Sequence, residues 1–198
     1  MKVTFALAGA AAITLPALAA PVFLPRAEGP PPLREADRYL SNVERAVFNG
    51  PVEDVIAHLN SDEGSVLAFV QQTDRIAGIG DEIPIEGTFP DVGALRILEL
   101  TDGSRVTERV VENTEARFAY QIWGFTAPAA RPIDHIHGYF SYEARDEETT
   151  EVVWTYAVAP RVFWARPFIQ GFLDNDFGPF MHSGLSGSAE AFNATVAN

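Results

Sequence analysis

The chain has 198 residues, and 27 Asp and Glu residues against 14 Lys and Arg residues give it a formal net charge of −13. This charge repels phosphate backbones and anionic lipid surfaces, so nucleic acid is not an expected partner. The chain has no cysteine, which excludes disulfides, thiolate catalysis and thiolate metal sites. A hydrophobic content of 47% with 14 Phe, 5 Tyr and 3 Trp supports one globular domain of ordinary size.

Residues 1–19 have the pattern of an export signal. Lys2 precedes an apolar run from Val3 to Leu15, and Ala17-Leu18-Ala19 forms a small-x-small cleavage pattern. We expect cleavage after Ala19 and an exported protein, in the periplasm or outside the cell. The alternative is an uncleaved membrane anchor, because no charge lies between Val3 and Pro25. Membrane contact is expected only in that case.

A proline-rich linker at residues 20–36 precedes a single domain at residues 37–198. The domain begins with a predicted strand from Arg38 to Phe48. A short helix follows at Pro51, where proline suits a first helical position, and a second begins near Ser65.

Six further strands are predicted from turn residues and from segments rich in β-branched and aromatic residues. An edge strand runs from Ile76 to Ile85, and a meander follows between Gly93 and Val158. Within the meander, Asp102-Gly103 fits a two-residue type I′ turn. The meander segments are Ala94 to Leu100, Arg105 to Glu112, Arg117 to Phe125, Ile136 to Asp146 and Thr149 to Val158.

From Phe163 to Val196 the apolar period becomes helical, with steps of three or four residues. Gly178-Pro179 lies inside this pattern and predicts a kink. The small residues Gly171, Gly178 and Gly184 indicate either room for a ligand or close packing. The fold class is therefore α+β, with seven antiparallel strands wrapped around one long C-terminal helix and two short helices after the first strand.

Five short motifs lie along the meander, namely Gly93-Ala94-Leu95-Arg96, Thr101-Asp102-Gly103, Thr107-Glu108-Arg109, Arg117-Phe118-Ala119-Tyr120 and Thr150-Glu151-Val152-Val153-Trp154. With these motifs the chain resembles the polyketide cyclase/dehydrase and lipid-transport family of the START-like, or SRPBCC, superfamily. The resemblance covers Asp37 to Val196 and implies a helix-grip fold with an apolar cavity between sheet and helix. It also implies binding of lipids, sterols, polyketides or other hydrophobic molecules, with catalysis in some members.

Glu108 is the candidate site carboxylate. A two-residue turn at Asp102-Gly103 places Ile97 opposite Glu108, on an apolar face that should point inward. Burial would raise the pKa of Glu108 and suit it to general acid/base catalysis or to anchoring a polar group of a ligand. The alternative is a buried glutamate paired for stability alone, with Gln121, a tyrosine hydroxyl or water. The predicted inward set is Leu95, Ile97, Val106, Glu108 and Val110, and the outward set is Arg96, Arg105, Thr107 and Arg109.

The other candidate ligand-binding residues come from the later strands and the helix. Alternation favours Phe140, Tyr142, Trp154 and Tyr156 as inward-facing, and a four-residue loop at 113–116 favours Gln121 and Trp123. Three helix residues form the stripe expected to close the cavity, namely Leu173, Phe177 and Met181. The alternative for the whole aromatic set is a filled core.

Neither a metal nor another cofactor is expected. Asp134-His135-Ile136-His137 places two histidines on one side of a strand, but that side is predicted to face outward and no third ligand is evident. His182 lies next to the helix stripe, as a surface histidine or as a base at the cavity rim.

The leading hypothesis is a binding or transport protein for a small hydrophobic molecule. The alternative is an enzyme of the cyclase or dehydratase kind that uses Glu108 with Tyr142 or Tyr156 as proton-transfer partners. A third reading is an interaction protein with a packed interior and no ligand. The family that the motifs resemble contains members that bind and members that catalyse, so both hypotheses are retained.

Overall fold

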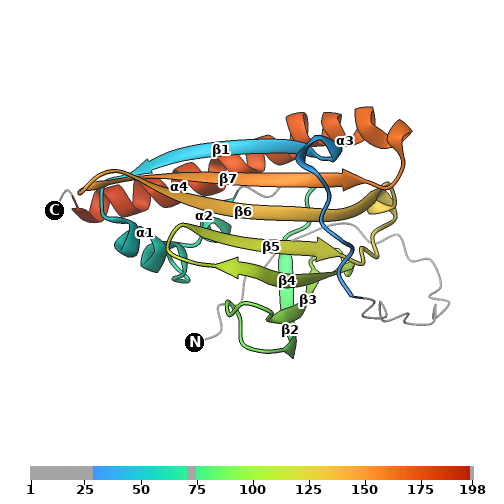
Figure 1. Cartoon of the computed structure of the whole chain (residues 1–198), viewed down its shortest axis with the longest axis horizontal. Helices are drawn as coiled ribbons and strands as arrows, with labels where there is room; N and C mark the ends of the chain where they lie inside the picture. Colours follow the sequence, from blue (N-terminus) through green and yellow to red (C-terminus); the bar gives the residue numbers. More distant parts are fainter. Residues whose placement is uncertain (1–28, 71–74, 197–198) are drawn as a thin grey trace, which may run out of the picture.

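The computed structural model describes residues 29–70 and 75–196, which form a seven-stranded antiparallel sheet with a long C-terminal helix along it (Figure 1). The predicted order of strand, two short helices, six strands and long helix is confirmed. The strand order across the sheet is β1-β7-β6-β5-β4-β3-β2. The elements are η1 (Ala36–Arg38), β1 (Leu40–Phe48), α1 (Val52–Leu59), α2 (Val66–Phe69), β2 (Ile79–Glu86), β3 (Leu95–Leu100), β4 (Arg105–Asn113), β5 (Arg117–Trp123), η2 (Pro128–Ala130), β6 (Ile133–Asp146), β7 (Thr149–Pro160), η3 (Phe163–Ala165), α3 (Arg166–Phe172), η4 (Leu173–Phe177) and α4 (Gly178–Val196).

The two faces of the sheet have different coverings. The inner face carries the main hydrophobic core, in which strand residues such as Val106, Ile122 and Trp154 pack with Leu173 and Met181 of the C-terminal helix. Directly opposed residues on neighbouring strands share a face, so the strand register assigns the other residues to the inner or outer face.

The described chain begins with an extended segment that crosses the outer face, residues 29–39, which we call the N-terminal strap (Figure 1). The Gln121 side chain donates a 2.8 Å hydrogen bond from Nε2 to the Pro31 carbonyl. Tyr39 packs with Ala157 and Ala159 in a small cluster separate from the main core. The proline-rich segment is therefore extended and attached to the sheet over its described part. The expected export signal at residues 1–19 lies outside the described residues.

The C-terminal helix is interrupted just before the predicted kink at Gly178-Pro179. Leu173–Phe177 forms a π-helical turn, and the Gly178 amide donates to the Leu173 carbonyl five residues back. Proline has no amide proton for the α-helical ladder, and apolar steps of four residues exceed the 3.6 residues of an α-helical turn. The wider π turn accommodates the proline and the four-residue spacing of the apolar residues. It keeps Leu173, Phe177 and Met181 in the core.

The helix glycines allow close packing. A Cβ atom at Gly184 would lie 2.7 Å from Cγ1 of Val70 and 3.0 Å from the carbonyl oxygen of Val66, so glycine lets α2 approach α4. A Cβ atom at Gly178 would lie 2.8 Å from the Asn42 amide nitrogen. At these two positions the structure therefore favours close packing over room for a ligand. None of the helices among the described residues is long and apolar enough to cross a membrane.

Candidate functional site

A buried ion pair on the inner face forms the polar centre of the candidate site. Arg96 of β3 lies directly opposite Glu108 of β4, and its Nε donates to Glu108 Oε2 at 2.5 Å. The side chains are only 13% and 7% exposed. Arg96 Nη1 also donates to Glu82 Oε2 at 2.6 Å, and its guanidinium carbon lies 3.5 Å from the centre of the Phe89 ring. Glu108 therefore points inward as predicted, but its partner is an arginine.

The prediction for β3 was wrong by one residue, and the turn gives the reason. The Gly103 amide donates to the Leu100 carbonyl, the Leu100 amide donates to the Ser104 carbonyl, and Gly103 has a φ of 78°. The loop thus has three residues with glycine in the left-handed position, where a two-residue turn was expected. One extra loop residue moves Arg96 to the inner face and Ile97 to the outer face, opposite Thr107. Ile97 is therefore not a residue of the inner site.

Two aromatic polar groups lie near the ion pair on the inner face. The Trp154 indole donates a 3.2 Å hydrogen bond to the Tyr120 hydroxyl. The ring of Tyr120 lies over Gly138, where any Cβ atom would collide with it. The rings of Tyr156 and Phe177 are 4.1 Å apart between centroids, which joins the sheet to the helix. Phe140 stacks on Trp154 at 5.0 Å, so the predicted inward residues of β6 and β7 line this face.

The prediction that Gln121 and Trp123 face inward was wrong. The loop before β5 is shorter than expected, and an irregularity between Val110 and Glu112 adds a residue to β4. Glu108 consequently lies opposite Ile122, while Gln121 lies opposite Arg109 on the outer face. Trp123 lies opposite Thr107 on the same outer face.

Arg96 and Tyr120 are the site residues that the sequence analysis missed. Both faces of residues 117–125 carry apolar side chains, so alternation alone does not fix which face is inner. One available signal was the small residue Gly138, because a glycine within a strand often marks a bulge, a bend or a close approach of another group. Tyr120 and Gly138 are indeed opposed in the register.

Burial controls the protonation of these groups. Loss of solvent raises the pKa of Glu108, and the nearby Arg96 guanidinium opposes but does not cancel this effect. Burial also raises the pKa of Tyr120 and of Tyr156, and the Glu108 charge adds to both shifts. Burial raises the pKa of Tyr142 to about 12, without a contribution from Glu108. Tyr120 and Tyr156 are thus the tyrosines in electrostatic reach of Glu108, and Tyr142 is not among them.

The predicted pair of histidines lies on the outer face, under the N-terminal strap. The Arg34 amide donates to the Tyr39 hydroxyl, which lies 2.8 Å from His135 Nε2. His135 Nδ1 lies 3.1 Å from Asp134 Oδ2, and Arg34 Nη2 donates to the same oxygen at 2.7 Å. These partners assign a neutral imidazole with its proton on Nδ1. The four residues close a ring of hydrogen bonds, which we call the strap ring.

The remaining histidine candidate, His182, lies on the helix surface. Its Nδ1 is 3.3 Å from Glu44 Oε2, and its side chain is 69% exposed. Among residues 29–70 and 75–196, no group of three or more His, Cys, Asp or Glu side chains is placed to hold a metal ion.

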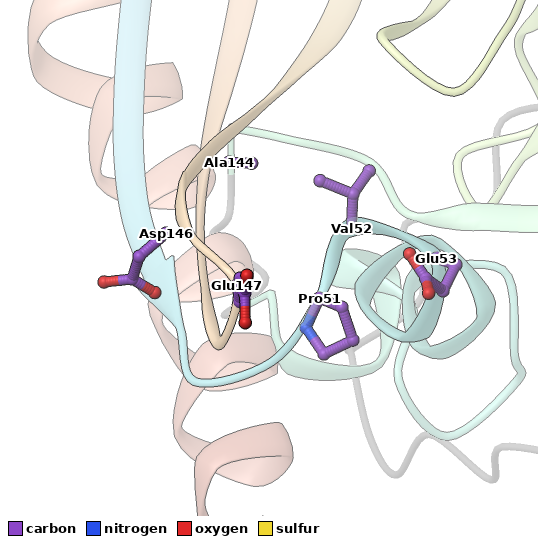
Figure 2. A pocket seen from close by; sticks show the side chains of 6 residues that line it. All are labelled: Pro51, Val52, Glu53, Ala144, Asp146 and Glu147. Carbon is purple, nitrogen blue, oxygen red and sulfur yellow. The ribbon is translucent and has the colours of Figure 1, made fainter.

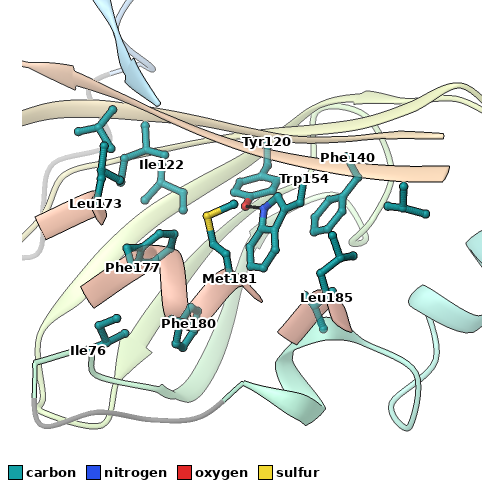
Figure 3. Close-up of a cluster of buried hydrophobic side chains, with 14 of the residues drawn as sticks. Ile76, Tyr120, Ile122, Phe140, Trp154, Leu173, Phe177, Phe180, Met181 and Leu185 are labelled. Atoms are coloured by element: carbon teal, nitrogen blue, oxygen red, sulfur yellow. Dashed lines mark hydrogen bonds between the residues drawn. The ribbon is translucent and has the colours of Figure 1, made fainter. Parts of the chain in front are cut away.

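Two open hollows of about 460 Å³ each lie on the outside of the molecule. One lies between the start of α1 and the β6–β7 hairpin, with Val52 and Asp146 in its wall (Figure 2). The other lies between β1 and the helix near His182. Figure 3 shows the space between helix and sheet, where Phe177, Phe180 and Met181 of the helix pack against strand residues.

A family model described as polyketide cyclase/dehydrase and lipid transport matches residues 41–193. The chain belongs to this family. The match includes β2 to β7, all of β1 except its first residue, and both residues of the inner ion pair. A search of curated proteins found no match.

Solved structures share the fold at low sequence identity. The protein XoxI from Bacillus cereus is 18% identical with a TM-score of 0.54, over 80% of this chain and 98% of that one. A protein from Thermobifida fusca is 21% identical with a TM-score of 0.53, over 78% and 93%. The di-domain aromatase/cyclase StfQ of the steffimycin pathway is 12% identical with a TM-score of 0.54, over 81% and 53%. These likenesses establish the START-like helix-grip fold.

Proposed function

We propose that the protein binds or transports a small hydrophobic molecule between the inner face of the sheet and the C-terminal helix. The observation that carries the proposal is the buried Arg96–Glu108 pair among aromatic side chains. Removing two charges from water is costly, and replacing such pairs by apolar residues is often neutral or stabilising. A few converging polar groups in an apolar surface are instead typical of ligand sites.

The ligand has to displace side chains that pack in this space. Met181 is the last residue of the helix stripe and is fully buried. Methionine is unbranched and flexible, so it can repack around a guest at small cost. The apolar body of the ligand would then contact Trp154, Phe177 and Met181, and its polar group would reach the Arg96–Glu108 pair.

Native mass spectrometry of the full chain, recovered from the exported fraction of a bacterium and then denatured, tests binding directly. We expect a discrete hydrophobic adduct that is released on denaturation. Glu108→Gln should lower affinity for that molecule roughly 10- to 150-fold, because hydrogen bonds to charged groups contribute about 1.5–3 kcal/mol. Gln121→Leu, on the outer face, is the matched control and should bind normally. No adduct, and no saturable binding to a panel of lipids, sterols and polyketides, would remove the proposal.

A second candidate is a cyclase or dehydratase activity on the same ligand. It is favoured by the raised pKa of Glu108, since a carboxyl group that titrates closer to neutral pH is a better proton donor and acceptor. Tyr120 or Tyr156 is better placed than Tyr142 as the proton-transfer partner, because the Glu108 charge raises the pKa of both. Unchanged turnover in Glu108→Gln would exclude this mechanism.

We also propose that the protein is exported. Lys2, the apolar run that follows it and Ala17-Leu18-Ala19 support a cleaved signal. A mass that begins at Ala20 in the exported fraction is the expected result, whereas an intact N-terminus in the membrane fraction would favour the anchor.

A further inference from the structure

The turn between β7 and the C-terminal helix exposes three large aromatic side chains. Phe163 is 83% exposed, Trp164 is 69% exposed and Phe168 is 60% exposed. We call these three residues the aromatic patch. Trp164 and Phe168 are four residues apart in helical backbone and so lie on one side of it. Single exposed apolar residues are ordinary, but three neighbouring aromatic side chains indicate a contact surface.

The charge around the aromatic patch is opposite to that of the whole protein. The chain segments 124–132 and 160–173 contain three arginines and no acidic residue, although the chain as a whole has a net charge of −13. The arginines are Arg131, Arg161 and Arg166. Within the described part of the chain, none of them has a carboxylate within ion-pair distance; Arg161 Nη2 reaches only the Ile133 carbonyl, at 3.4 Å. These two segments are thus basic as well as aromatic, and the nearest acidic residues in the sequence, Asp134 and Asp174, lie just beyond their ends.

Aromatic residues continue from the patch toward the interior. Phe172 lies four residues beyond Phe168 and is half-buried. Its ring centroid is 5.8 Å from that of Phe177, which in turn is 4.1 Å from that of Tyr156 on the inner face. Phe172, Phe177 and Tyr156 thus form a chain of ring contacts that begins one helical turn beyond Phe168 and ends on the inner face.

We propose that the aromatic patch docks on the surface of a lipid bilayer that contains anionic lipids. Trp and Phe prefer the interface between water and hydrocarbon, and arginine pairs with lipid phosphates. The N-terminal strap meets this same end, where Arg34 Nη1 donates to the Pro160 carbonyl at 2.9 Å. This docking is independent of what the inner site binds.

Tryptophan fluorescence of the full chain with vesicles tests the docking. Trp123 and Trp154 are 6% and 3% exposed, so Trp164 is the tryptophan that a bilayer can reach. With vesicles of phosphatidylcholine and phosphatidylglycerol, we expect a blue shift of emission and quenching by lipids brominated on their acyl chains. Both signals should be absent in Trp164→Phe.

Two sets of variants separate the apolar and the charged contributions. Phe163→Ser with Phe168→Ser should weaken the fluorescence-detected binding about tenfold or more, because two aromatic side chains no longer leave water. Arg161→Gln with Arg166→Gln should remove the dependence on phosphatidylglycerol. The matched control is Ile85→Ser with Val92→Ser, two residues that are 52% and 62% exposed near the opposite edge of the sheet. This control should bind like the parent.

Three results would overturn the proposal. If the protein sediments with vesicles while Trp164 emission stays that of an indole in water, another part of the chain holds the membrane. If Trp164 becomes protected without vesicles as protein concentration rises, the patch pairs with a second copy. If the protein neither sediments with vesicles nor changes its Trp164 emission, it does not dock on such a bilayer.

Discussion

The two faces of the sheet bury polar groups for different purposes. On the outer face, the strap ring joins the N-terminal strap to β6, and the strap has no strand ladder of its own to hold it there. On the inner face, Arg96 and Glu108 join β3 to β4, which are already paired through their backbones. The outer network thus attaches a segment that no strand pairing holds, whereas the inner pair links two strands that their backbones already join. This comparison is the structural reason for assigning a ligand to the inner face.

Removing Arg96 should have the largest effect. Arg96→Met leaves the Glu108 carboxylate buried without its partner, and we expect a loss of about 3 kcal/mol in the free energy of unfolding near neutral pH. Urea denaturation measures this loss. The double variant Arg96→Met with Glu108→Leu should regain most of the stability while losing the ligand. If the double variant stays as unstable as the single one, the pair is structural and the comparison fails.

Breaking the strap ring should come next. Tyr39→Phe removes the hydroxyl that joins the Arg34 amide to His135 and leaves Nε2 of a buried histidine without a donor. We expect about 2 kcal/mol of destabilisation, and faster proteolysis within residues 29–39. Tyr139→Phe is the control, because that hydroxyl makes no hydrogen bond in the described part of the chain. Ligand binding should persist in both variants, and its loss in Tyr39→Phe would contradict the separation of the two faces.

Gln121→Leu should have a smaller effect, because it removes a single hydrogen bond, from Gln121 Nε2 to the Pro31 carbonyl. We expect a loss of about 1 kcal/mol in the free energy of unfolding. Affinity for a ligand should not change. A large loss of affinity would return Gln121 to the site and would mean that the inner face is not the binding surface.

The pH dependence of the free energy of unfolding tests the same comparison of the two faces, and its expected effects are the smallest. The pKa of Glu108 is raised in the folded protein, so its contribution is complete below its ordinary value of 4.5 and is lost as pH rises through the folded value. The pKa of His135 is lowered by burial, so its contribution is complete above 6.5 and is lost as pH falls through the folded value.

Thermal unfolding across the acid range checks these opposite signs. In the parent, Glu108 should make the protein less stable as pH rises, and this trend should be lost in Glu108→Gln. His135 should make the protein more stable as pH rises, and this trend should be lost in His135→Asn. Parallel profiles for the parent and either variant would show that the residue does not titrate as its burial indicates.

The fold could be predicted from the sequence because it depends on patterns that recur over many residues. The alternation in β6 and β7 correctly placed Phe140, Tyr142 and Trp154, and the helical period correctly placed Leu173 and Met181. Each of these assignments rests on several residues of the same strand or helix whose spacing indicates the same buried face. A single atypical residue does not change them.

The site could be predicted only in part because it depends on register. A hairpin loop one residue longer than expected moved Arg96 inward and Ile97 outward, and an extra residue in β4 did the same for Tyr120 and Gln121. A shift of one residue reverses the face of a whole strand, and Asp-Gly is compatible with more than one turn. The inward assignment of Glu108 was correct because it rests on Val106 and Val110, the apolar residues on the same face of its own strand.

The π turn in the C-terminal helix determines how α3 is rotated about the helix axis relative to α4. Each residue of an α-helix turns the chain by about 100°, so one residue more or fewer at Leu173–Phe177 would rotate α3 by that angle about its axis. Such a change would leave the residues of α4 in place against the sheet. It would aim Trp164 and Phe168 at a different side of the molecule. The length of this one turn therefore sets the direction in which the protein presents its aromatic end.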